Sequence, residues 1–301
     1  MAEQLAHDDW KGRTDGMPWM HRMLIRALKF IDLRFAYLGM AVFAVPFYIL
    51  FRPQGFIAIY HYFRQRWGYG LWESLGHACL NHYRFGQVVI DRFAAYAGRK
   101  FEFELDNDEL FQELSSRKEG FMVLSCHVGN YEMAGYTLVN RKKRFNALVF
   151  PGEAKDVMEY RNRILSKNNI RMIPVADDLS HIFLMNDALA SGEILSVPGD
   201  RVFGSPRYVE CELLGATARL PLGLYLLAIQ RDVPTVALFV MKQSAYRYKV
   251  YVRPVGIDDR EYASQQEKAA NLAQHFACEM ETILEEYPEQ WFNFYEYWNY
   301  D

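Results

Sequence analysis

Short apolar segments alternate with helical patterns over about the last 200 residues, and this alternation constrains the fold more than any other feature. Segment 120–126 is almost entirely apolar, as is typical of a parallel strand buried on both faces. The pattern predicts an α/β fold with a largely parallel or mixed central sheet flanked by helices. Strands are expected at 100–105, 120–126, 145–150, 171–175, 193–197, 234–241 and 246–253. Helices are expected at 71–97, from Asp106 or Asn107 onward, and at 130–139, 155–168, 179–190, 220–230 and 261–287.

The N-terminal part contains an uncharged run of 17 residues, 35–51, between Arg34 and Arg52. A membrane-spanning helix needs roughly 20 apolar residues, so the run is of borderline length, and Pro46 is expected to kink it. Three interpretations stay open: a core helix, a short or tilted span, and a helix lying in the membrane interface. Residues 1–66 hold nine Lys and Arg against five acids, which suits an anionic membrane surface. We therefore expect a membrane-associating segment at 1–66 and the main domain at 67–301.

Composition and residue patterns argue against several other classes of protein. A net charge of −3 argues against a nucleic-acid-binding protein, and a mean hydropathy of −0.18 excludes a polytopic membrane protein. The four cysteines form no C-x-x-C pair, so the pattern predicts neither a disulfide framework nor a zinc site. The first 15 residues are polar and predict no cleavable signal peptide, which favours a cytoplasmic protein.

A polar cluster at 125–132 follows the expected buried strand and precedes a helix. Active sites of α/β sheets lie at the carboxyl ends of strands, so His127 is the candidate general base, with Glu132 as the carboxylate that orients its ring. The alternative is an ordinary helix start, with Asn130 as its cap. Cys126 precedes His127 directly, but neighbours in a strand point to opposite faces, so we do not expect a Cys–His pair.

The residues His-Val-Gly-Asn-Tyr-Glu at 127–132 match the H-x4-[DE] motif of glycerolipid acyltransferases. More narrowly, the chain resembles the bacterial lipid A acyltransferases of the lauroyl and myristoyl type. Segment 195–200 resembles the strand of that family that ends in a Pro-x-Asp turn, and 210–227 falls at its acceptor-lining loop and following helix. Pro288 to Phe292 match the C-terminal Pro-Glu-Gln-Trp signature.

This resemblance implies a glycerolipid acyltransferase-like fold and transfer of a fatty acyl group from an acyl thioester to a hydroxyl of a membrane lipid or glycolipid. The donor would be acyl carrier protein or CoA, with no metal, no further cofactor and no nucleic acid. His127 would be the base and Glu132 would orient it. The implied place of action is the cytoplasmic face of the inner membrane. The implied substrate-binding residues are Arg161 (or Arg163), Asp200, Asn130 and Arg201.

One departure bears on the acceptor. After residue 292 the family usually has a basic stretch, whereas residues 293–298 are aromatic and acidic here. A diphosphorylated glycolipid would favour positive charge at this place. Three alternatives therefore stay open: an acyltransferase for another amphiphile such as an aminolipid or polyene, an acyl thioesterase, and a non-catalytic lipid-binding protein.

Overall fold

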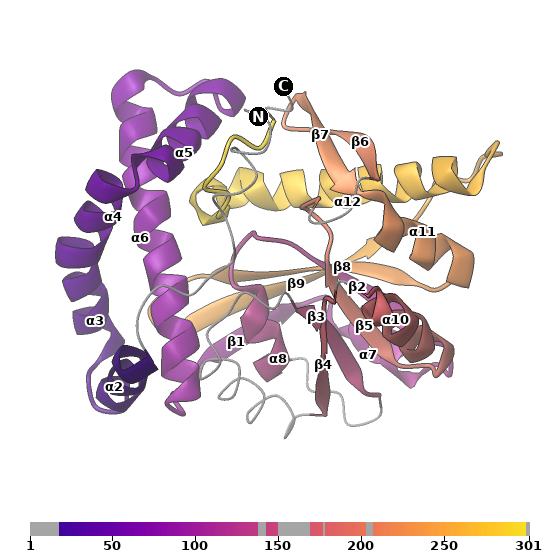
Figure 1. Cartoon of the computed structure of the whole chain (residues 1–301), viewed down its shortest axis with the longest axis horizontal. Helices are drawn as coiled ribbons and strands as arrows, with labels where there is room; N and C mark the ends of the chain where they lie inside the picture. Colours follow the sequence, from indigo (N-terminus) through magenta and orange to yellow (C-terminus); the bar gives the residue numbers. More distant parts are fainter. Residues whose placement is uncertain (1–17, 138–142, 150–168, 177, 203–206, 299–301) are drawn as a thin grey trace.

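A computed structural model describes residues 18–137, 143–149, 169–176, 178–202 and 207–298. At its centre lies a seven-stranded sheet in the order β1-β9-β8-β2-β5-β3-β4 (Figure 1). The run from β8 to β4 is parallel, whereas β9 is antiparallel to β8 and β1 is parallel to β9. The predicted α/β fold with a mixed, largely parallel sheet is confirmed. Its strands are β1 (Glu102–Asp106), β2 (Phe121–Ser125), β3 (Phe145–Val149), β4 (Ile170–Pro174), β5 (Ile194–Pro198), β8 (Thr235–Lys242) and β9 (Arg247–Val255).

Both faces of the sheet are covered, as the apolar character of β2 predicts. Met122 and Leu124 belong to a core cluster on one face, and Phe121 and Val123 to a cluster on the other. Figure 1 shows α12 lying along one face and α8 on the opposite side. Among the described residues, the α-helices from residue 71 onward are α6 (Leu71–Tyr96), α7 (Asp108–Ser116), α8 (Ala134–Thr137), α10 (Ser180–Ala190), α11 (Leu222–Arg231) and α12 (Gln265–Glu286).

Residues 208–221 differ from the expectation of a loop followed by a helix starting at Leu220. They form a hairpin of β6 (Tyr208–Leu213) and β7 (Ala216–Pro221), and the helix starts at Leu222. Leu214 and Gly215 both have positive φ, at 52° and 69°, which is the geometry of a tight two-residue hairpin turn. Side chains of β6 alternate between exposed and buried, and this alternation is the sequence signal that indicates a strand here.

The expected helix at 130–139 is a short 3-10 turn, Tyr131–Met133, followed by α8 up to Thr137. The expected helix at 155–168 and the strand residue Phe150 lie outside the described residues.

Helices α2 (Pro18–Leu28), α3 (Leu33–Gly39), α4 (Val45–Phe51) and α5 (Pro53–Arg66) pack along α6 at one side of the sheet (Figure 1). A π-helical turn, Met40–Ala44, joins α3 to α4 directly before Pro46, whose missing N–H interrupts regular α-helical bonding. Ile59 and Phe63 of α5 belong to the main core cluster, and the domain boundary at residue 66 stays a prediction.

The continuous helix Leu33–Phe51 is long and apolar enough to cross a membrane, yet only 11% of its most apolar window is buried. A core helix would be mostly buried, so the core interpretation is wrong. By its length, composition and exposure, this helix is a candidate for contact with a membrane. Its exposed apolar side chains, here named the apolar stripe, are Phe35, Leu38, Val42, Phe43, Phe47, Leu50 and Phe51.

A buried ionic cluster joins this helix to the sheet. Lys242 of β8 and Asp91 of α6 form an ion pair whose side chains are both completely buried. Tyr37 of α3 and Tyr248 of β9 also donate their hydroxyls to Asp91, and Lys242 Nζ donates to the Tyr37 hydroxyl at 3.1 Å. Asn130 Nδ2 in turn donates to the Tyr248 hydroxyl at 3.2 Å. Removal of one charge would leave the other buried and uncompensated.

We expect Asp91→Ala to lower the free energy of unfolding by about 3–5 kcal/mol in urea denaturation. Glu113→Ala is the matched control, because Glu113 pairs with Arg117 on the exposed surface of α7, and it should cost less than about 1 kcal/mol. The double variant Asp91→Leu/Lys242→Met should recover part of the loss. An unchanged urea midpoint for Asp91→Ala would contradict this account.

Candidate active site

His127 lies just past the carboxyl end of β2, and a buried carboxylate holds its ring. Nδ1 of His127 is 3.0 Å and 3.1 Å from the two carboxylate oxygens of Asp200, and the His127 backbone N–H donates to Asp200 Oδ2 at 2.9 Å. The Asp200 side chain is completely buried. An ionised carboxylate only accepts hydrogen bonds, so Nδ1 carries the ring proton and Nε2 keeps its lone pair.

The register of two parallel strands brings this pair together. Ser125 of β2 is paired with Pro198 of β5, and two further residues along each strand lead to His127 and Asp200. Both side chains therefore lie at the carboxyl edge of the parallel strands, where α/β folds place their ligands.

Gly129 lets the loop after His127 lie directly against β8. Its φ is +68°, and a Cβ at this position would lie 2.3 Å from the carbonyl oxygen of Val240. The next residue, Asn130, donates its backbone N–H to the same oxygen at 2.7 Å. A side chain at residue 129 would therefore move the loop that carries His127.

The C-terminal signature holds the same loop from the other side. The Gln290 carbonyl accepts the Gly129 N–H at 2.7 Å, and the Phe292 N–H donates to the His127 carbonyl at 2.9 Å. The Gln290 side-chain amide also makes two hydrogen bonds to the backbone of Lys242, at 2.9 Å and 3.0 Å. The signature therefore fixes the His127 loop to the end of β8.

Burial and neighbouring charges shift the pKa values of both His127 and Asp200. Burial, with a further contribution from Arg201, lowers the pKa of His127 below its usual value, although the Asp200 charge and hydrogen bond oppose the shift. Burial raises the pKa of Asp200, but His127 and then Arg201 outweigh it, so the carboxyl pKa falls below its usual range. Near neutral pH the pair is thus a neutral imidazole and a carboxylate, which is the state that a general base requires.

Glu132 binds a different helix. Its Oε1 lies 3.0 Å from a guanidinium nitrogen of Arg92, and the Tyr96 hydroxyl lies 3.5 Å from Oε2. Both partners belong to α6. The carboxylate that contacts the Nδ1 of His127 is that of Asp200, whereas the sequence predicts this contact for Glu132. The contacts of Arg92 and Tyr96 with Glu132 are not predicted from sequence, because the regular helical stripe of α6 gives no sign of them.

The other predicted site residues that the structure describes, Asn130 and Arg201, make contacts of their own. Asn130 is buried, makes no capping hydrogen bond with its side chain, and binds Tyr248 as described above. Arg201 follows Asp200 directly and donates to the Phe292 carbonyl at 2.7 Å. Arg161 and its alternative Arg163 lie outside the described residues. The substrate-binding roles of these residues stay predictions.

A small cavity of about 60 Å³ lies beside the His127 loop. Its walls come from β2, β3, β4, β5, β8, α6 and the segment 131–135, and they are mainly apolar, with Glu132 and Ser125 among them. The apolar lining residues are Ala134, Phe145, Ala147, Leu148, Ile170, Pro198 and Leu238. Neither His127 nor Asp200 lines this recess, which lies next to the loop that carries His127.

Comparison with known proteins gives one family. The model of the family described as bacterial lipid A biosynthesis acyltransferase matches residues 92–299. Among solved structures, the 1-acyl-sn-glycerophosphate (LPA) acyltransferase PlsC from Thermotoga maritima is similar with a TM-score of 0.40 and 13% identity, over 90% of this chain and 99% of that chain. A comparison with curated proteins finds no match.

The His127–Asp200 contact predicts a measurable titration. In NMR spectra of the imidazole protons, the His127 resonance, assigned with His127→Ala, should titrate with a midpoint below about 6.5. Because the Asp200 charge raises this pKa, Asp200→Asn should lower the midpoint further. Glu132→Gln should change the His127 midpoint less than Asp200→Asn does. Asp258→Asn, which removes the partner of His275, should leave it unchanged. An upward shift in Asp200→Asn would exclude the assigned contact.

Proposed function

The chain belongs to the bacterial lipid A biosynthesis acyltransferase family, and on that premise we propose that it transfers a fatty acyl group from an acyl thioester to a hydroxyl of a membrane lipid or glycolipid. The donor would be an acyl carrier protein or a CoA thioester, and no further cofactor is proposed. The observation that carries the proposal is the His127–Asp200 pair at the carboxyl edge of the parallel strands.

In the proposed reaction, His127 Nε2 takes the proton of the acceptor hydroxyl as the hydroxyl oxygen attacks the thioester carbonyl. The tetrahedral intermediate collapses, the carbon–sulfur bond breaks, and the thiolate leaves with the proton that His127 returns. Asp200 holds the reactive tautomer through Nδ1 and stabilises the imidazolium that forms between the two proton transfers. In this mechanism Asp200, rather than Glu132, orients the base.

A direct transfer without a covalent acyl-enzyme fits the neighbouring groups. Cys126, the nearest thiol in sequence, is buried, and burial raises its pKa well above the usual thiol value. A protonated, buried thiol is a poor nucleophile. Glu132 and Arg92, joined as an ion pair, would keep the 131–133 turn fixed against α6.

The apolar stripe supports a reaction at the membrane surface, where lipid acceptors are found. Arg34 and Arg52 flank the stripe, and the basic N-terminal segment would favour anionic headgroups on the cytoplasmic face of the inner membrane. Arg161 and Arg201 are proposed to bind anionic parts of the substrates. The acidic, aromatic segment at 293–298 favours an acceptor less charged than a diphosphorylated glycolipid.

The catalytic part is tested with purified protein, acyl carrier protein and CoA thioesters in separate reactions, and a panel of lipid acceptors followed by mass spectrometry. His127→Ala should lower acyl transfer by about 10²–10⁴-fold, the usual contribution of a general base. Cys126→Ala, which changes the adjacent residue, should keep transfer within about twofold if Cys126 has no chemical role.

Full transfer by His127→Ala would refute the proposed base. Release of thiol that needs no acceptor, and that no lipid in the panel accelerates, would instead identify a thioesterase.

The membrane part is tested by sedimentation with vesicles that contain anionic phospholipid. Phe43→Asp/Leu50→Asp should lower vesicle binding more than about tenfold, because two side chains lose favourable transfer into the membrane. Phe183→Asp is the control, since Phe183 is equally exposed but lies on α10. Equal binding of both variants would contradict a role for the apolar stripe.

A further inference from the structure

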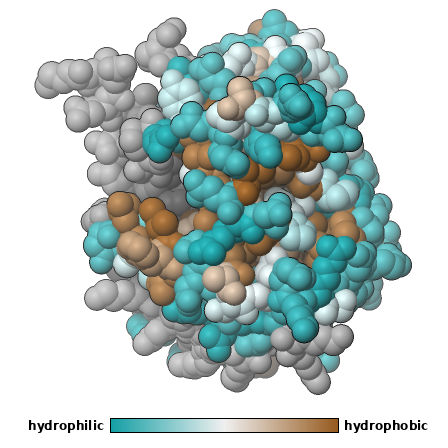
Figure 2. All heavy atoms as spheres, turned by 90° about the vertical axis from the view of Figure 1, so that its right-hand side faces the viewer, coloured by the Kyte–Doolittle hydropathy of each residue, from teal (hydrophilic) through white to brown (hydrophobic). Residues whose placement is uncertain are grey.

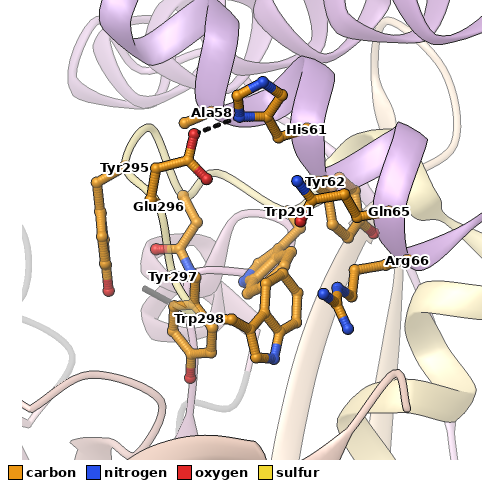
Figure 3. A pocket seen from close by; sticks show the side chains of 11 residues that line it. Ala58, His61, Tyr62, Gln65, Arg66, Trp291, Tyr295, Glu296, Tyr297 and Trp298 are labelled. Atoms are coloured by element: carbon orange, nitrogen blue, oxygen red, sulfur yellow. Dashed lines mark hydrogen bonds and ion pairs between the residues drawn. The ribbon is translucent and has the colours of Figure 1, made fainter. Parts of the chain in front are cut away.

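A second cavity, of about 420 Å³, lies between α5 and the C-terminal segment (Figure 3). Its walls come from α5 residues 58–66 and from residues 291–298, and neither His127 nor Asp200 lines it. The volume is in the range of small-molecule sites. This headgroup cavity, as we name it, is therefore separate from the candidate active site.

Aromatic rings form much of its wall. The Trp291 ring lies 4.9 Å from Tyr62 and 5.2 Å from Trp298, in both cases edge to face. Figure 3 shows Tyr295, Tyr297 and Trp298 around the same space, facing Tyr62 and Arg66 across it. Flat aromatic faces favour a ligand with a ring and exposed C–H groups.

Several buried polar atoms around this cavity have no hydrogen-bond partner among the residues that the structure describes. They are the indole N–H groups of Trp291 and Trp298, the Nε of Arg66, and both amide atoms of Asn293. Asn293 is only 2% exposed. Buried polar groups in folded proteins are nearly always paired, so this concentration points to a ligand that supplies the missing partners.

Of the charged groups that line the cavity, Glu296 has a partner, whereas Arg66 has no ion-pair partner within the described residues. Glu296 Oε1 lies 2.6 Å from His61 Nδ1, shown as a dashed line in Figure 3. The Arg66 guanidinium lies 4.9 Å from the Trp298 ring centre and makes no ion pair within the described part of the chain. Its donors are therefore available to oxygen atoms of a ligand.

We propose that the headgroup cavity binds a polyhydroxylated ring, that is, a sugar residue. The C–H faces of such a ring pack on aromatic side chains, and each hydroxyl can both donate and accept. A carboxylate or a phosphodiester accepts only, and would leave the Asn293 carbonyl oxygen without a donor. The inference goes beyond the proposed acyl transfer, because it concerns a different site and holds whatever reaction His127 catalyses.

The walls of the cavity are joined to the candidate active site. Trp291 forms a β-bridge with Val128, next to His127, and the Tyr297 hydroxyl donates to the Asp200 carbonyl at 2.6 Å. A ligand that orders residues 291–298 would thus also steady the His127 loop. The sugar could be free or the headgroup of a lipid, since α5 directly follows the apolar stripe.

The test is binding of the full chain to two sugar sources. Free methyl β-glucoside and N-acetylglucosamine are titrated by ligand-observed NMR, and phosphatidylcholine vesicles with or without a glucosyl lipid are used in sedimentation. Gln65→Ala and Arg66→Ala, both on the cavity side of α5, should each weaken sugar binding about tenfold. Gln54→Ala, at an exposed position of the same helix, is the matched control and should bind like the unmodified chain.

Binding of free sugars that both cavity variants weaken supports the proposal with a soluble ligand. Binding only to glucosyl-lipid vesicles, weakened by the same variants, supports it with a lipid headgroup. Absence of sugar binding from both sources, binding that the variants do not change, or binding of inorganic phosphate in place of sugar overturns it. Loss of acyl transfer in His127→Ala affects none of these outcomes, so the two proposals fail separately.

Discussion

The carboxylate of Asp91 is completely buried, and a buried charge is tolerated only when protein groups replace its water. Those groups come from three other elements: Lys242 from β8, Tyr37 from α3 and Tyr248 from β9. The geometry of one carboxylate thus fixes how the N-terminal helix, α6 and the sheet lie together. Through Tyr248 and Asn130 it also extends to the loop after His127. Packing alone would permit small sliding movements of these helices, whereas a buried ionic cluster favours one arrangement.

Much of the fold can be predicted from local patterns, because strands buried on both faces and amphipathic helices leave periodic apolar residues. The hairpin at 208–221 was missed although β6 carries a period of two. In contrast, no local sequence pattern shows that β2 and β5 are neighbours in the sheet. For this reason His127 could be proposed as a candidate from sequence, but its contact with Asp200 could not. A carboxylate five residues away is visible in the sequence, whereas one 73 residues away requires the sheet order and its register.

The C-terminal signature at 288–292 holds one part of the site in place and lines another cavity. In the structure, Gln290 joins the His127 loop to β8, and Trp291 turns its ring away into the headgroup cavity. Residues 293–298, together with α5, contribute further walls of that cavity. The same short segment therefore both holds the His127 loop and lines a cavity.

The apolar stripe is joined rigidly to the body of the protein, because Tyr37 on the opposite side of its helix is fixed in the Asp91 cluster. A protein attached to a membrane through such a helix keeps one orientation, and its distance from the bilayer varies little. Encounter with a lipid then depends on lateral diffusion within a plane, and the quantity that sets the rate is the number of acceptor molecules per unit of membrane area. Dilution of the bulk solution would leave that rate unchanged, whereas dilution of the acceptor with inert lipid would lower it.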